Sequence, residues 1–313
     1  MIMHRADPTA VIRALRSAAP YIRLYKGKTF IVKAGGGVFG DPVATRALVE
    51  QIAILHSLGI RVVFVHGGGP QLTEVTEKLG VPTQMIEGRR VTDERSIDAT
   101  AMVLSGLINT RILAVCRELH VPAIGISGVD AGLIQAHKRA PVKLQSSDET
   151  VDYGFVGDID YIDTDVVRKL LDNGLMPVIS PLSSDMSGTL LNINADTVAA
   201  SLGAALGAEK LLLCTGAPGI LERLEDPGSV ISYTDLAGLD QLRRQGSLAD
   251  GMLPKAKAIE TAIKGGVKRV HVISYKSADA ILAEVFTNEG TGTLVVADIG
   301  KLEPAELAAG VQG

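Results

Sequence analysis

Short apolar segments alternate along this chain with glycine-rich turns and longer helix-like segments, and this order limits the possible folds more than any other feature. Segment 29–33 runs into the glycine-rich turn 34–40, and segment 61–65 runs into Gly67, Gly68 and Gly69. Repeats of strand, glycine turn and helix are typical of a mostly parallel sheet with helices on both faces. The sequence therefore predicts an α/β fold, a three-layer αβα sandwich with a mostly parallel central sheet.

The composition agrees with strands that are buried on both faces. Hydrophobic residues make up 46% of the chain, whereas aromatic residues make up 4% and Trp is absent. The core must therefore be built from Val, Ile, Leu and Ala, which are common in buried parallel strands. We expect strands at 29–33, 61–65, 122–126, 176–180, 210–214 and 267–273, and helices at 43–58, 94–119, 196–206 and 254–263.

Three regions can be distinguished along the chain. A helix is expected over residues 10–22, ahead of the first strand, so residues 1–25 form an N-terminal helical extension. This extension is either an oligomerisation arm or a leader packed on the body. Residues 26–180 and 181–313 are expected to form two lobes, and the sheet can run through both. The polar stretch 138–163 is expected to be a hairpin-rich insertion, and residues 302–313 a short, weak helix.

Charge and residue usage exclude several classes of function. The formal net charge of −4 gives no reason to expect nucleic acid or a membrane surface as a partner. No apolar stretch reaches the roughly 20 residues that span a bilayer, and the N-terminus does not resemble a signal peptide, so we expect a soluble, cytoplasmic protein. Cys116 and Cys214 lie in apolar surroundings and are expected to be inert, buried thiols. The six His residues show no ligand spacing, and no protein metal site is expected.

Two glycine clusters follow apolar strands. Gly35 and Gly36 come after the first strand, and Gly68 and Gly69 come after the second. Each cluster could be no more than a tight turn. Backbone N–H groups in such turns can also approach an anion closely, and ligands of open α/β sheets collect beyond the carboxyl ends of the strands. Two clusters on neighbouring strands favour a shared anion pocket.

Three charged residues stand where local structure does not require them. Lys33 ends an apolar strand beside a glycine turn, and Lys255 begins a helix, where a cation opposes the helix dipole. Asp196 follows Asn192 and Asn194 at the start of an apolar helix, although a single cap would satisfy that helix. Two lysines and an organising carboxylate are suited to phosphoryl transfer, which depends on positioning and charge neutralisation.

Arg90 is a candidate for binding a carboxylate group. It follows Arg89 shortly before a helix, and a guanidinium group can bind a carboxylate through two parallel hydrogen bonds. A basic pair on the surface would have the same sequence pattern. Asn192 could likewise bind a substrate amide or carboxylate, or simply assist in capping the helix.

At these positions the chain resembles the amino-acid kinase family, and within it the acetylglutamate kinase branch. The resemblance covers residues 21–296. It is carried by segments 27–37, 65–70, 88–94, 126–133, 154–157, 192–197 and 251–255. It implies the amino-acid kinase fold, ATP with Mg²⁺ held mainly by the nucleotide, and N-acetyl-L-glutamate as phosphoryl acceptor in arginine biosynthesis. It also implies that residues 26–180 bind the acetylamino acid and residues 181–313 the nucleotide.

The resemblance assigns a role to each candidate residue. Lys33 and Lys255 would stabilise the transferring phosphoryl group, and Asp196 would organise both lysines. The remaining candidates would bind the two substrates: Gly68, Gly69, Arg90 and Asn192 the acetylamino acid, and Gly35, Gly36, Thr215 and Gly216 the phosphates or nucleotide. The chain departs from the pattern in the first glycine turn, where relatives usually have Tyr in place of Ala34 and Asn-Ala-Met from Gly37 onward. It departs again at Gly216, where relatives often have Asp.

The resemblance extends to arginine-sensitive members, which carry an N-terminal helix and a C-terminal signature. Segments 284–287 and 290–293 resemble that signature. This implies inhibition by L-arginine and a homo-oligomer, a hexamer built from dimers. Two alternatives share much of the pattern: a regulatory, arginine-sensing kinase-like domain related to acetylglutamate synthase, and a kinase for another acidic amino acid such as carrier-bound aminoadipate.

Overall fold

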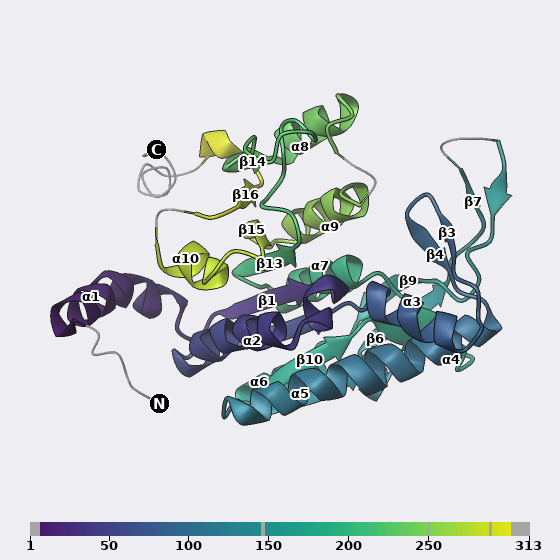
Figure 1. Ribbon diagram of the computed structural model, residues 1–313, viewed down its shortest axis with the longest axis horizontal. Helices are drawn as coiled ribbons and strands as arrows, with labels where there is room; N and C mark the ends of the chain where they lie inside the picture. Colours follow the sequence, from purple (N-terminus) through teal and green to yellow (C-terminus); the bar gives the residue numbers. More distant parts are fainter. Residues whose placement is uncertain (1–6, 145–147, 249–250, 288–289, 302–313) are drawn as a thin grey trace.

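The computed structural model describes residues 7–144, 148–248, 251–287 and 290–301, and its centre is one eight-stranded sheet (Figure 1). The six strands from β15 to β5 are parallel, whereas β16 is antiparallel to β15. In spatial order the strands are β14 (Tyr233–Asp235), β16 (Thr293–Val296), β15 (Arg269–Ser274), β13 (Lys210–Thr215), β1 (Thr29–Ala34), β2 (Arg61–His66), β10 (Met176–Ser180) and β5 (Ala123–Ser127).

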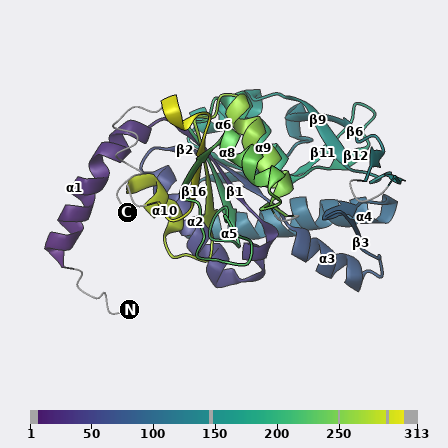
Figure 2. The same cartoon turned by 90° about the horizontal axis from the view of Figure 1, so that it is seen from above.

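Helices cover both faces of this sheet, which confirms the predicted α/β sandwich (Figure 2). On one face lie α6 (Asp165–Asp172), α7 (Ala195–Leu206), α8 (Leu236–Arg244) and α9 (Leu253–Lys264). On the other lie α2 (Pro42–Ser57), α5 (Asn109–Glu118) and α10 (Ala280–Phe286). The strands of both expected lobes join in this sheet, and the division of the chain at residue 180 stays a prediction.

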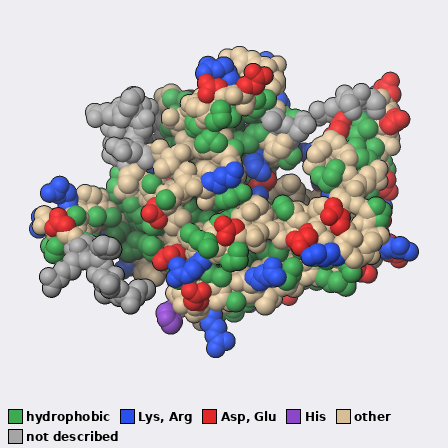
Figure 3. All heavy atoms as spheres, in the orientation of Figure 1, with side chains coloured by type: hydrophobic (Ala, Val, Ile, Leu, Met, Phe, Trp, Pro, Cys, Tyr) green, Lys and Arg blue, Asp and Glu red, His purple; other side chains and the backbone are tan. Residues whose placement is uncertain are grey.

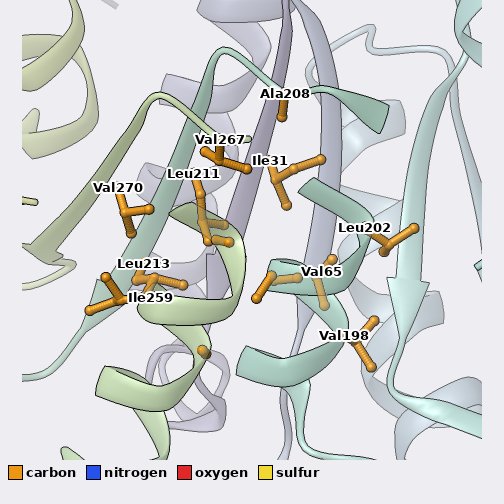
Figure 4. Close-up of a cluster of buried hydrophobic side chains, with 14 of the residues drawn as sticks. Ile31, Val65, Val198, Leu202, Ala208, Leu211, Leu213, Ile259, Val267 and Val270 are labelled. Carbon is orange, nitrogen blue, oxygen red and sulfur yellow. The ribbon is translucent and has the colours of Figure 1, made fainter. Parts of the chain in front are cut away.

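Alternate residues of the central strands enter two separate cores. Ile31 of β1 packs under α7 and α9, whereas its neighbours Phe30 and Val32 pack under α2, and all three are fully buried. Figure 4 shows the first core, in which Val198 and Leu202 of α7 lie beside the sheet. Burying a side chain of this size contributes roughly 1.5–3 kcal/mol. The two cores fix where each strand ends, and therefore where the following turns lie.

The expected helix 94–119 is one helix with a change of pitch. It consists of α4 (Glu94–Ala101), a π-helical stretch (Met102–Ile108) and α5. This 25-residue helix is long and apolar enough to cross a membrane by length and composition only. Its side chains Val103, Leu104, Ile108 and Ile112 are buried in the second core, as in the core helix of a soluble protein.

A smaller region projects beyond the carboxyl ends of the central strands. It contains a four-stranded sheet in the order β12 (Leu190–Asn192), β11 (Leu182–Ser184), β6 (Ile134–Lys138) and β9 (Gly157–Ile162). Two hairpins extend it, β3 (Gln84–Ile86) with β4 (Arg89–Val91), and β7 (Val142–Lys143) with β8 (Thr150–Val151). The expected hairpin-rich insertion is therefore present.

The N-terminal helix α1 (Pro8–Tyr25) begins and ends beyond the expected 10–22 and extends away from the body (Figures 1 and 2). The Asp7 side chain caps it by accepting a hydrogen bond from the Thr9 amide at 3.0 Å. Tyr25 is its one buried residue and packs edge-on against Phe30. The short helix expected at 302–313 lies outside the described residues.

Candidate active site

Parallel pairing brings the two predicted glycine turns together. Lys33 lies opposite Val65 of β2 and Leu213 of β13, so the three strands end at the same edge of the sheet. Just beyond this edge, the Gly67 amide donates to the Ala34 carbonyl at 2.8 Å. In the view of Figure 3, the molecular surface is hollowed between the part that carries α8 and α9 and the projecting hairpins.

The two turns approach so closely that only glycine fits at their point of contact. A Cβ atom on Gly36 would lie 2.8 Å from the Gly68 Cα, and a Cβ atom on Gly68 would lie 2.3 Å from the Ile108 side chain. The Gln71 side chain, which the sequence analysis did not identify, ties the turns together by donating to the Gly36 carbonyl at 2.8 Å. The backbone N–H groups of both turns are thus concentrated in one place, as anion binding requires.

Lys33, Asp196 and Lys255 meet beside these turns. Lys33 Nζ lies 2.8 Å from Asp196 Oδ1, and Lys255 Nζ donates to Asp196 Oδ2 at 2.9 Å. The first contact is an ion pair without hydrogen-bond alignment, because Oδ1 has no well-oriented donor. One carboxylate therefore holds two ammonium groups, which come from the end of β1 and the start of α9.

The pKa values of this cluster reflect both burial and charge. Burial alone would raise the pKa of the Asp196 carboxyl, but the charges of Lys33 and Lys255 outweigh it and hold the pKa below its usual value. Burial lowers the pKa of the Lys33 ammonium, with Asp196 opposing and Lys255 adding to this shift. Asp196 is therefore ionised at neutral pH, and it partly offsets the cost of burying Lys33.

The start of α7 shows why Asp196 is available for this task. Asn194 is the cap of this helix, and its side-chain oxygen accepts from the amides of Asp196 at 2.8 Å and Thr197 at 3.2 Å. The capping function is thus already fulfilled. The Asp196 side chain is left free to bind the lysines, as the excess of polar residues in this segment suggested.

Arg90 belongs to β4, and its side chain contacts the start of helix α3 (Gly69–Lys78). Its guanidinium group donates to Thr83 Oγ1 at 2.8 Å, to the Thr73 hydroxyl, and to the Gly69 carbonyl at 3.3 Å. Burial lowers the pKa of Arg90 from its usual value. These contacts fix a cation beside Gly69, next to the second glycine turn.

Asn192 lies at the end of β12 and is connected to the segment that carries Arg90. Its side-chain amide donates to Thr92 Oγ1 at 3.2 Å, and its backbone amide donates to the Phe155 carbonyl at 2.8 Å. The Phe155 amide in turn donates to the Thr92 carbonyl at 2.7 Å. The four residues predicted to bind the acceptor, Gly68, Gly69, Arg90 and Asn192, therefore belong to one connected region of backbone and side-chain contacts.

Thr215 and Gly216 lie on the opposite side of Lys33, at the end of β13. The Thr215 hydroxyl contacts the Ala217 carbonyl at 3.0 Å and the Ala217 amide at 3.1 Å, so it shapes the turn that follows the strand. Gly216 is exposed. Thr215 and Gly216 thus lie on one side of Lys33, and Gly68 and Gly69 lie on the other.

His66 supports the second glycine turn from within the core. Its Nδ1 lies 3.2 Å from the Gly67 carbonyl, and Asn109 Nδ2 lies 3.2 Å from its Nε2. Burial lowers the pKa of His66 to about 4, so the ring is neutral at physiological pH. A neutral ring that donates from Nδ1 and accepts at Nε2 fits both contacts.

Both cysteines lie in the second core. Cys116 and Cys214 are buried, and burial raises the pKa of the first thiol to about 11 and of the second to about 12. Neither thiol is therefore a nucleophile at neutral pH. Among the described residues, no group of three or more His, Cys, Asp or Glu side chains could hold a metal ion.

Comparison with known proteins agrees with this geometry. Residues 28–274 match the model of the amino acid kinase family. The chain is 48% identical over 287 residues to an acetylglutamate kinase of Myxococcus xanthus, covering 90% of this chain and 93% of the relative. It is 39% identical over 285 residues to an acetylglutamate kinase of Archaeoglobus fulgidus, covering 91% of this chain and 98% of the relative.

Solved structures give the same fold. N-acetylglutamate synthase from Neisseria gonorrhoeae, complexed with coenzyme A and N-acetyl-glutamate, superposes with a TM-score of 0.79 at 27% identity over 92% of this chain. The chain spans only 63% of that synthase chain. Carbamate kinase from Giardia lamblia bound to AMP-PNP superposes with a TM-score of 0.60 at 19% identity, covering 87% of this chain and 99% of that one, and shares the fold.

The chain therefore belongs to the amino acid kinase family. Within that family it belongs with the acetylglutamate kinases, which it matches over nearly their whole length.

The buried cluster predicts a large effect of neutralising Asp196. Asp196→Asn leaves two ammonium groups without their carboxylate, and breaking a buried ion pair in this way costs about 3–5 kcal/mol. We expect the free energy of unfolding, measured in urea by circular dichroism at pH 7, to fall by this amount. Asp98→Asn, at an exposed position of α4, should stay within about 0.5 kcal/mol of the wild type. Equal stability of the two variants would contradict the assigned ion pairs.

Proposed function

We propose that this protein transfers the γ-phosphoryl group of ATP to the γ-carboxylate of N-acetyl-L-glutamate, giving N-acetyl-L-glutamyl 5-phosphate and ADP in arginine biosynthesis. The observation that carries the proposal is the pair of ammonium groups that Asp196 holds beside the two glycine turns. The two relatives that align with 90% and 91% of this chain are acetylglutamate kinases.

The reaction needs charge neutralisation more than proton transfer. The acceptor carboxylate is already ionised at neutral pH, so it attacks the γ-phosphorus without a general base. As the bond to the β-phosphate oxygen breaks, negative charge is shared by the transferring group and the leaving ADP. Lys33 and Lys255 would stabilise this charge, and the backbone N–H groups of Gly36 and Gly68 would hold phosphate oxygens.

The acceptor would bind on the side of β2 and the projecting hairpins. Arg90 would pair with the α-carboxylate of N-acetyl-L-glutamate, and Asn192 would hydrogen-bond to the acetylamino group. Gly68 and Gly69 would donate backbone hydrogen bonds. Residues 26–180 would supply most of this half of the site, and we propose that they form the acetylamino-acid-binding lobe.

The nucleotide would bind on the side of β13, in the C-terminal lobe 181–313. Gly35, Gly36, Thr215 and Gly216 would border its phosphates. Asp196 is engaged by two lysines, and no carboxylate cluster exists among the described residues, so Mg²⁺ would be bound mainly by the triphosphate itself. The hydrogen-bond donors that surround this region are suited to a metal–nucleotide complex. We also propose that the protein is located in the cytoplasm.

A panel of acceptors tests the proposed reaction. With ATP and Mg²⁺, we expect ADP release with N-acetyl-L-glutamate and much slower release with glutamate, N-acetylaspartate and aminoadipate. A preference for aminoadipate would favour the alternative acceptor. Absence of ADP release with every acceptor would favour the regulatory, arginine-sensing domain, although such a domain has no need of Lys33, Asp196 and Lys255 together.

We propose further that α1 joins copies of this chain. Four large apolar side chains of this helix are exposed, namely Val11, Ile12, Leu15 and Leu24. A helix that extends from the body with an apolar surface is suited to pack against the same helix of another copy. This supports the hexamer built from dimers rather than a leader packed on its own body.

Deleting residues 1–25 tests the arm. We expect the wild-type chain to have the mass of a hexamer in sedimentation equilibrium and the shortened chain the mass of a dimer, because the apolar contact of α1 is lost. Substituting Ser for both Ile12 and Leu15 should have the same effect without shortening the chain. An unchanged mass in both cases would contradict the arm.

Inhibition by L-arginine is supported by a buried carboxylate on α10, in the segment that resembles the arginine-sensitive signature. Glu284 accepts from the Thr291 amide at 2.8 Å and lies 2.7 Å from His271 Nδ1. Burial alone would raise the pKa of Glu284, but His271 and the Thr291 amide outweigh it and lower the pKa below its usual value. An ionised carboxylate in this segment is suited to bind a guanidinium group. N-acetylglutamate synthase from Neisseria gonorrhoeae has been solved in complex with coenzyme A and L-arginine.

Removal of this charge should weaken inhibition. We expect Glu284→Gln to raise the arginine concentration for half-inhibition at least tenfold, because a charged hydrogen-bonded pair is replaced by a neutral one. The exposed residue Glu77 provides the control, and Glu77→Gln should leave that concentration unchanged. The same half-inhibition in both variants, or no inhibition of the wild type, would contradict the proposal.

A further inference from the structure

The side chain of Tyr275 lies where the nucleotide half of the site opens. Tyr275 directly follows β15, and its backbone amide donates to the Thr215 carbonyl at 2.9 Å. Because β15, β13 and β1 are neighbouring parallel strands (Figure 1), Tyr275 lies at the same sheet edge as Gly216 and Gly35. The sequence analysis assigned no function to it.

The Tyr275 hydroxyl group lies between two of the positions at which the chain departs from its relatives' pattern. A Cβ atom on Gly37 would lie 2.6 Å from Tyr275 Oη, and a Cβ atom on Gly216 would lie 3.3 Å from the same atom. The hydroxyl group therefore occupies the space that side chains at both positions would need. Both departures therefore adjoin one side chain, a tyrosine between the first glycine turn and the turn after β13.

This hydroxyl group is available to a ligand. Tyr275 is partly exposed, and its Oη forms no hydrogen bond with any residue in the described part of the chain. Nearby, Lys33 Nζ lies 3.9 Å from the position of a Cβ on Gly35. Lys276, whose side chain reaches the Gly216 turn, forms no ion pair with a described residue. An unbonded hydroxyl group and two ammonium groups thus surround the turns assigned to phosphate.

We propose that Tyr275 is a nucleotide-binding residue whose hydroxyl group donates a hydrogen bond to the diphosphate that remains in ADP. This inference rests on the proposed use of ATP at this site. The γ-phosphoryl group would lie between Lys33 and Lys255, and the acceptor would lie on the β2 side. Tyr275 follows β15, which lies two strands from β1 on the side away from β2. Its hydroxyl group would therefore face the phosphates nearer to the nucleoside.

Isothermal titration calorimetry of the full chain with Mg-ADP tests the role of Tyr275 in the absence of any acceptor. We expect Tyr275→Phe to raise the Kd for ADP about tenfold, since a hydrogen bond to a charged phosphate is lost, and to raise the KM for ATP but not for N-acetyl-L-glutamate. Tyr161→Phe, at an exposed position of β9, is the matched control and should bind ADP like the wild type.

Gly37→Ala provides an independent test of the geometry. Its Cβ would collide only with the end of the Tyr275 side chain, so it should displace the hydroxyl group and weaken ADP binding about as much as Tyr275→Phe. In the Tyr275→Phe background the nearest ring atom, Cζ, would lie 3.5 Å from this Cβ, an ordinary contact, so Gly37→Ala should have little further effect.

The outcomes separate this inference from the proposed function. Unchanged ADP binding by Tyr275→Phe, or fully additive effects of the two substitutions, would overturn the role of Tyr275 while the kinase activity stands. Wild-type chain that binds ADP but phosphorylates none of the acceptors would overturn the proposed function alone. Wild-type chain that does not bind ADP would overturn both.

Discussion

The contact between one buried carboxylate and two lysines is the constraint on which the site depends. Two ammonium groups repel each other, and burial disfavours the charged form of each. Asp196 offsets both effects in part by lying 2.8 Å from Lys33 and 2.9 Å from Lys255. The three residues come from β1, α7 and α9, so the pairing also requires that the sheet and two helices pack in one arrangement.

The architecture around this contact leaves it flanked by turns on two sides of β1. β1 lies at the centre of the sheet with β2 on one side and β13 on the other. The turns that follow these strands lead to the region of Arg90 and Asn192 in one direction and to Gly216 and Tyr275 in the other. Glycine at position 36 allows the two turns to touch, and glycine at position 68 leaves room for the Ile108 side chain beneath them, so the backbone donors of both turns are concentrated in one place.

The sequence predicted those features that local rules determine. Lys33 at the end of an apolar strand, Lys255 at a helix start and Asp196 beyond the need for a cap each broke a local preference, and the structure brings all three together. The parallel strands and the helix 94–119 were predicted from their apolar patterns. The catalytic and binding roles of these residues stay predictions.

Features that depend on spatial order could not be predicted from the sequence. Tyr275 adjoins Gly37 only because β15 lies beside β13 and β13 beside β1, and no short-range pattern specifies that order. Gln71 reaches Gly36 across two turns, and His271 meets Glu284 between a strand and a helix. The π-helical stretch 102–108 has the same apolar pattern as the α-helix around it, so composition gave no sign of it.

The most direct test of the account compares two lysines of α9 that differ in their contacts. Lys255 binds Asp196, whereas Lys257, two residues along the helix, is exposed. Turnover with ATP and N-acetyl-L-glutamate should fall by about two to three orders of magnitude in Lys255→Met, because a cation that stabilises the transition state is lost, and should be unchanged in Lys257→Met. Equal turnover in the two variants would contradict the claim that the lysine pair held by Asp196 performs phosphoryl transfer.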